Sequence, residues 1–164
     1  MLKVEIMFKA VALSFVVGGL ASFSAAHAQE TAAPSAEQMN QGKMVYMQTC
    51  LACHQPTGMG LPMVFPPLAK TEYVLGVPDR FVAMILKGNM GPMTIDGKPF
   101  NNIMPPQEAM LTDEKVAAVA TYVRNSFGNT ASAVTPAQVT AVRAKFAERK
   151  TSWTEAELKA WKSE

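Results

Sequence analysis

Residues 50–54 read Cys50-Leu51-Ala52-Cys53-His54, and this stretch decides how the chain of 164 residues can fold. The cysteines lie three positions apart at the end of a stretch with helical spacing, so their thiols face the same side. Each thiol can form a thioether bond to one vinyl group of a haem, and the following imidazole can reach the iron. This C-x-x-C-H pattern predicts one covalent haem c, attached at Cys50 and Cys53, with its iron bound by His54.

Three other kinds of site use closely spaced cysteines. A thioredoxin-like redox pair needs a βαβ context, which this sequence does not show. A zinc site needs about four Cys or His ligands, whereas the chain has two cysteines and two histidines, of which His27 belongs to the leader described next. A structural disulfide suits an oxidising compartment, but it would leave the domain without a core.

The first 28 residues have the features of a secretory signal peptide. Lys3 and Lys9 precede an apolar run from Ala10 to Leu20, which is short for a membrane span of roughly 20 residues. Small residues follow at 24–28, so we expect cleavage after Ala28. The mature protein is then expected to be periplasmic, with no stable membrane insertion.

The charge of the mature chain excludes strong affinity for polyanions. Removal of the leader takes away Lys3, Glu5 and Lys9 and leaves 13 basic and 12 acidic residues, a net charge of +1. We therefore expect no nucleic-acid partner.

The mature sequence predicts an all-α domain with long loops. Residues 29–37 form a predicted disordered lead-in, and helical spacing then runs from Ala36 to Thr49. Further helices are predicted at Asp79–Lys87 and, behind a threonine cap, at Thr112–Phe127. No alternating run makes a β-strand convincing.

These helices cannot bury enough apolar surface by themselves. Nine prolines and six glycines fall within the 56 residues from Gln55 to Met110, which favours loops there. A stable domain of this kind needs something to fill its centre, and a haem does so.

The second axial ligand of the iron must be a residue other than histidine, because His54 is the single histidine of the mature chain. Methionine is a soft ligand that raises the reduction potential. We expect Met104 to be this ligand, since it lies in a loop stiffened by Pro105 and Pro106 shortly before the last core helix. Met93 and Met110 are the alternatives.

The order of these features resembles class I, mitochondrial-type, mono-haem cytochromes c over residues 38–128. The shared features are Gly42 and Tyr46 in the first helix, C-x-x-C-H, a Pro-Leu loop, the Met-Pro loop and a last helix that carries Tyr122. Residues 65–68 and 121–125 are also similar to cytochrome domains associated with copper nitrite reductases and periplasmic dehydrogenases.

The resemblance implies a cytochrome c fold with particular contacts. Gly42 would allow a close crossing of the first and last helices, with Tyr122 packed nearby. The carbonyl of Pro66 or Pro67 would accept a hydrogen bond from Nδ1 of His54 and orient its ring.

The implied function is electron transfer, by a carrier or by the cytochrome subunit of a redox complex, and not an enzymatic reaction. A six-coordinate iron has no open position for a substrate. The expected partners are redox proteins: a dehydrogenase, a reductase or a terminal oxidase. The alternative is a haem enzyme or a gas sensor with a displaceable sixth ligand.

Residues 129–164 extend beyond the resemblance as a predicted helical C-terminal extension. A helix-like stretch runs from Pro136 to Arg149, and Thr154 with Glu157 can form a capping box. The stretch also carries large apolar side chains, namely Val139, Val142, Phe146, Trp153, Leu158 and Trp161. These side chains either pack on the cytochrome domain or anchor a redox partner, and we expect docking without a role in holding the haem.

Overall fold

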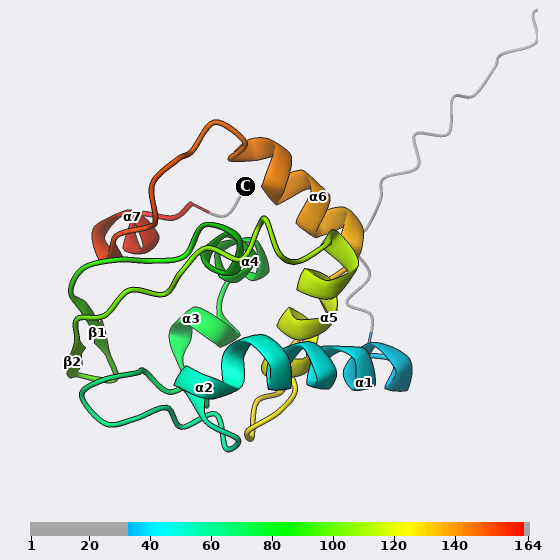
Figure 1. The fold of residues 1–164 in the computed structure, drawn as a ribbon, viewed down its shortest axis with the longest axis horizontal. Coiled ribbons are helices and arrows are strands. Elements are labelled where there is room, and N and C mark those ends of the chain that lie inside the picture. Colours follow the sequence, from blue (N-terminus) through cyan, green and yellow to red (C-terminus); the bar gives the residue numbers. More distant parts are fainter. Residues whose placement is uncertain (1–32, 163–164) are drawn as a thin grey trace, which may run out of the picture. The chain divides into compact units, whose positions relative to one another are not determined.

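The computed structural model describes residues 33–162, so the predicted signal peptide and its cleavage site lie outside the described residues. The elements, in chain order, are α1 (Ala36–Val45), η1 (Tyr46–Cys50), α2 (Leu51–His54), α3 (Glu72–Leu75), α4 (Pro78–Lys87), β1 (Met93–Ile95), β2 (Lys98–Phe100), α5 (Asp113–Arg124), α6 (Pro136–Lys145) and α7 (Glu155–Lys159) (Figure 1). Within this part of the chain, no helix has the length and apolar character that crossing a membrane requires.

The first helix runs into the cysteines, as predicted. It begins at Ala36, behind Ser35, whose side chain accepts a hydrogen bond from the amide of Gln38, so the last two residues of the predicted lead-in are helical. After Val45 the helix widens into one π-helical turn, η1, and then tightens again into α2. This continuous course brings Cys50, Cys53 and His54 to one site.

Helices α1 and α5 cross in direct contact at Gly42. A Cβ atom placed on this glycine would lie 2.1 Å from the carbonyl oxygen of Ala118 and 2.6 Å from Cβ of Tyr122. The ring of Tyr122 packs on Tyr46, with ring centroids 5.5 Å apart. The close crossing implied by the resemblance is therefore confirmed, and only glycine fits at its centre.

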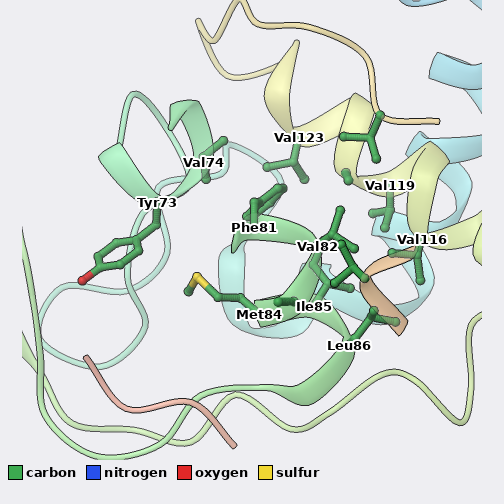
Figure 2. Packing of buried hydrophobic residues seen from close by; sticks show 14 of the residues in the cluster. Tyr73, Val74, Phe81, Val82, Met84, Ile85, Leu86, Val116, Val119 and Val123 are labelled. Atoms are coloured by element: carbon green, nitrogen blue, oxygen red, sulfur yellow. The ribbon is translucent and has the colours of Figure 1, made fainter. Parts of the chain in front are cut away.

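Helix α4 supplies the middle of the core. It begins with Pro78 as its first residue and ends at Lys87, with Gly88 as its C-cap, so it is one residue longer than predicted. Figure 2 shows side chains of α4 and α5 together in one buried cluster, with Phe81 and Val82 among those from α4. Because the buried face of α4 also lines the candidate site, the core and the site share one wall.

The prediction of helices and loops is confirmed apart from two short elements in the region predicted as loops, the one-turn helix α3 and a hairpin. Strands β1 and β2 pair antiparallel, with Ile95 opposite Lys98. Asp96 and Gly97 form the loop, both at positive φ (51° and 73°), as a tight two-residue hairpin turn of this kind requires. The sequence contains this turn signal, but strands of three residues are too short to show an alternating pattern.

The C-terminal extension packs back on the domain. Val134, Val139 and Leu158 are fully buried, and Trp153 is 5% exposed. Both α6 and α7 begin with capping boxes, the second of them at Thr154 and Glu157 as predicted. Of the two alternatives for the apolar side chains of the extension, packing on the domain is therefore the one observed: Val139, Val142, Trp153 and Leu158 are buried, and Phe146 and Trp161 are partly buried against the same core. A docking role for the extension stays a prediction.

Candidate functional site

The two cysteines and the histidine line one cavity. Cys50 ends η1, whereas Cys53 and His54 lie in α2, and both cysteines are partly buried free thiols. Burial, followed by the neighbouring Cys53 thiol, raises the pKa of Cys50 to about 11. A redox-active cysteine pair needs a thiol with a lowered pKa, so the environment of Cys50 is opposite to the one that a thioredoxin-like site provides.

His54 is held in the form that binds a metal. Its Nδ1 lies 3.0 Å from the carbonyl oxygen of Pro66, which identifies Pro66 and not Pro67 as the partner. Burial lowers the pKa of His54, although the hydrogen bond to Pro66 acts in the opposite direction. Because a carbonyl can only accept, Nδ1 carries the proton of the neutral ring, and Nε2 keeps its lone pair for a metal.

Met104 lines the same cavity as His54. Its amide donates to the carbonyl of Asn89 (2.9 Å), and its carbonyl accepts from the amide of Asn89 (3.1 Å). Gly88 makes this approach possible, since a Cβ atom there would lie 2.1 Å from the carbonyl oxygen of Met104. The loop is therefore fixed by contacts with the end of α4.

The alternative methionines differ in their surroundings. Met93 also lines the cavity, but its sulfur lies 2.9 Å from Nδ2 of Asn89, which donates to it. Met110 is 72% exposed and lies outside the cavity lining. Of the three predicted candidates, Met104 and Met93 are therefore brought to the cavity and Met110 is not. Met84, from the buried face of α4, lines it as well.

Tyr73 and Asn89 are residues of the site that the sequence analysis missed. The Tyr73 hydroxyl is buried, lines the cavity and has no hydrogen-bond partner among the described residues. Burial is the main cause that raises its pKa, so it remains a hydrogen-bond donor. Each is a single polar residue outside any motif, and no sequence signal pointed to it.

The cavity fits a haem in its chemistry. Apart from the groups already named, its lining is mostly apolar: Phe65, Pro67, Leu68, Val74, Phe81, Ile85, Ile95, Phe100, Ile103, Leu111, Val119 and Val123. It thus offers two thiols, a neutral imidazole and a thioether among apolar side chains. The unsatisfied Tyr73 hydroxyl can donate to a carboxylate of the bound group, which satisfies a buried donor that is otherwise costly.

Comparison with known proteins agrees with this chemistry. The family described as "Cytochrome C oxidase, cbb3-type, subunit III" matches residues 37–123. Cytochrome c-552 of Thermus thermophilus is 34% identical over 92 residues, which cover 54% of this chain and 69% of the relative.

Two cytochrome subunits of dehydrogenases are also similar. The cytochrome c subunit of alcohol dehydrogenase (quinone) from Gluconobacter oxydans is 33% identical over 95 residues, 57% of this chain and 20% of the relative. The gluconate 2-dehydrogenase cytochrome c subunit from Pantoea cypripedii is 33% identical over 99 residues, 59% of this chain and 22% of the relative. The chain thus spans about a fifth of the length of these two subunits. With the match over residues 37–123, the chain belongs to the cytochrome c family, in the group described as cbb3-type cytochrome c oxidase subunit III, and its cofactor is a covalently bound haem c.

Proposed function

We propose that the protein transfers single electrons in the periplasm through one haem c that is ligated by His54 and Met104. The observation that carries this proposal is that one cavity is lined by Cys50, Cys53, His54 and Met104. When bound, the haem supplies an iron that alternates between Fe(III) and Fe(II).

The cysteines and His54 hold one side of the proposed site. The thiols of Cys50 and Cys53 would form the thioether bonds, which would fix the cofactor to the end of η1 and to α2. The Pro66 carbonyl keeps the His54 ring in one tautomer and one orientation. Because His54 follows a covalently attached residue, this ligand stays beside the iron even when other contacts loosen.

Met104 would be the second protein ligand of the iron. Its thioether is a soft ligand that favours the reduced iron and so raises the potential. If His54 and Met104 both bind the iron, the site would offer no place for a substrate. The apolar lining excludes water from the site, which reduces the reorganisation that accompanies a change of charge.

The partners are proposed to be redox proteins. Relatives of this chain are cytochrome subunits of an alcohol dehydrogenase and a gluconate 2-dehydrogenase, so a dehydrogenase is the first candidate, with a reductase or a terminal oxidase as the others. The protein acts as a diffusing carrier or as one subunit of such a complex, and it catalyses no substrate reaction itself.

Replacement of the methionines tests the proposal. Met104→Ala should abolish the weak ferric absorption band of the iron–thioether bond, admit carbon monoxide to the reduced protein and lower the potential. Met110→Ala, a change at an exposed position, is the matched control and should leave all three unchanged. Met93→Ala tests the rival ligand within the cavity.

Two results would contradict the assignment. Loss of the thioether band in Met93→Ala, with the band intact in Met104→Ala, would make Met93 the ligand. Rapid binding of carbon monoxide by the unaltered reduced protein would favour the haem enzyme or gas sensor instead.

A further inference from the structure

Three distant segments of the chain lie side by side at the Met104 loop. On one side of Asn89, backbone hydrogen bonds join it to Met104 in both directions. On the other side, the Trp153 amide donates to the carbonyl of Gly88 (3.0 Å), and the Met90 amide donates to the carbonyl of Trp153 (2.8 Å). Residues 88–90 thus form a narrow central strand between the Met104 loop and the C-terminal extension.

Trp153 is anchored more firmly than a residue of an exposed tail. Its side chain is 5% exposed, and its indole Nε1 donates to the carbonyl of Ala83 in α4 (3.0 Å). Phe146 packs edge-on against the ring with centroids 5.0 Å apart, and the guanidinium of Arg149 lies 3.7 Å above the ring centre. The residue that hydrogen-bonds to the central strand is therefore fixed to the core by its side chain.

A second connection joins the C-terminal extension to the chain just after Met104. The Lys87 side chain is 5% exposed, and its ammonium pairs with the Glu108 carboxylate (2.7 Å) and donates to the carbonyl of Arg149 (3.0 Å). Arg143 of α6 donates to the carbonyl of Glu108 (2.9 Å). Met104 is thus tied to the extension through residues 88–90, and Glu108, which follows the Met104 loop, is tied to it directly and through Lys87.

We propose that Trp153 is a positioning residue for Met104, and that the C-terminal extension holds the sixth ligand in place. The inference rests on the proposed role of Met104. Pro105 and Pro106 have no amide hydrogen to donate, and the loop belongs to no helix. Beyond the prolines, the amides of Gln107 and Glu108 donate to carbonyls of α4 (3.1 Å and 3.2 Å), so the two bonds with Asn89 are the backbone support at Met104 itself. Loops of this kind open at lower free energy than the core, and Trp153 restricts that opening.

The first test uses the unaltered protein and hydrogen exchange at four amides: Asn89, Met90, Met104 and Trp153. If the three segments act as one unit, these amides exchange through one common opening and respond in parallel to low concentrations of denaturant. Exchange of Met104 and Asn89 independently of Met90 and Trp153 would overturn the proposal.

The second test compares Trp153→Ala with Leu158→Ala, a matched control at a buried position of α7 that takes no part in the three-segment contact. Trp153→Ala should speed exchange of the Met104 amide about tenfold or more and raise the apparent affinity of the ferric protein for added imidazole by a similar factor, because the open fraction increases. Trp153→Phe should keep both readouts close to those of the unaltered protein, since an aromatic ring still packs against Phe146.

The control separates positioning from general stability. Leu158→Ala should lower the melting temperature while leaving both readouts unchanged. If both variants change the exchange of the Met104 amide and the imidazole affinity in proportion to the stability that each loses, the inference is overturned. If Met104 is not the ligand, Met104→Ala reveals it through the thioether band, whereas the exchange of the Met104 amide still reports whether Trp153 holds the loop.

Discussion

The two walls of the cavity are built in different ways. On the His54 wall, the attachment residues follow one another within η1 and α2, and the partner of His54 is Pro66, in the next loop. On the Met104 wall, the loop is held by the end of α4 and, beyond it, by Trp153 near the end of the chain. One wall is local in sequence, and the other depends on three distant segments.

This difference predicts which wall opens first. Local contacts form at little entropic cost, whereas contacts between distant segments are lost together when tertiary structure loosens. The proposed thioether bonds at Cys50 and Cys53 would add a covalent restraint on the His54 wall alone. We therefore expect perturbations to expose the sixth coordination position before the fifth.

The largest effect should come from removing the covalent restraint. Cys50→Ala combined with Cys53→Ala should abolish haem retention under acid and organic extraction, and Cys53→Ala alone should weaken it, because coordination does not survive these conditions. The measurement is the haem that stays with the denatured polypeptide. A haem that is fully extractable from the unaltered protein would refute the attachment.

One glycine on each wall gives a matched comparison. Gly88 and Gly60 both have positive φ (68° and 63°). A Cβ atom on Gly88 would lie 2.1 Å from the carbonyl oxygen of Met104. A Cβ atom on Gly60 would lie 2.2 Å from the carbonyl oxygen of Phe65 and 2.6 Å from that of Pro66. Each alanine substitution should cost about 2 to 4 kcal/mol of unfolding free energy, from backbone strain and from displacement of the opposing carbonyl. Only Gly88→Ala should also admit carbon monoxide.

The control for this pair is Gly97→Ala. Gly97 has a similar φ of 73°, but a Cβ atom there meets nothing within 4 Å. It should therefore show the cost of backbone strain alone, about 1 kcal/mol, without any change at the iron. Carbon monoxide binding in Gly60→Ala as strong as in Gly88→Ala would show that the two walls do not differ in this way.

How far the sequence predicts the structure follows the same division. The C-x-x-C-H stretch, Pro78 at the start of α4 and the Thr112 cap of α5 are local signals. The first lies at the end of the predicted helix, and α4 and α5 begin within one residue of their predicted starts. Helix α5 ends at Arg124 and not at Phe127, because the chain turns there: Asn125 leaves the helical conformation and Phe127 has a positive φ of 59°.

Contacts between distant segments have no comparable local signal in the sequence. The hydroxyl of Tyr73 matters because it is buried, and Asn89 matters because two other segments lie beside it. Trp153 is recognisable in the sequence as a large apolar residue in a polar stretch. The sequence around it does not determine whether its ring packs on this domain or on another protein. Burial of that kind is decided by the whole chain.

A smaller effect is expected from the ion pair beside the Met104 loop. Lys87→Met should lower the unfolding free energy by about 1 to 2 kcal/mol, because Lys87 is buried while Glu108 stays partly in water. The control is Lys159→Met, which removes an i,i+4 pair between the exposed Lys159 and the partly buried Glu155 and should cost clearly less. Equal losses in chemical denaturation would show that the buried ammonium contributes no more than a surface charge.

The smallest effect should appear where the extension meets the start of α5, away from Met104. The Asp113 carboxylate accepts hydrogen bonds from Thr140 and, at 2.8 Å, from Nε of Arg143, and these contacts, that of Thr140 first, lower the pKa of Asp113. A carboxyl whose pKa is lower in the folded state stabilises that state above its unfolded value of about 4. This contribution is lost as the pH falls through the folded pKa.

Asp113→Asn should therefore lower the unfolding free energy at neutral pH by about 0.5 kcal/mol, and the difference from the unaltered protein should shrink as the pH falls below about 4. Denaturant unfolding at several pH values measures this difference, with the exposed turn residue Asp96, changed to Asn, as the control. A difference that stays constant down to low pH would mean that Asp113 acts through its shape and not through its charge. Carbon monoxide binding should stay unchanged in Asp113→Asn, because Arg143 keeps its bonds to the carbonyls of Glu108 and Leu111, and the Met104 wall then retains its support.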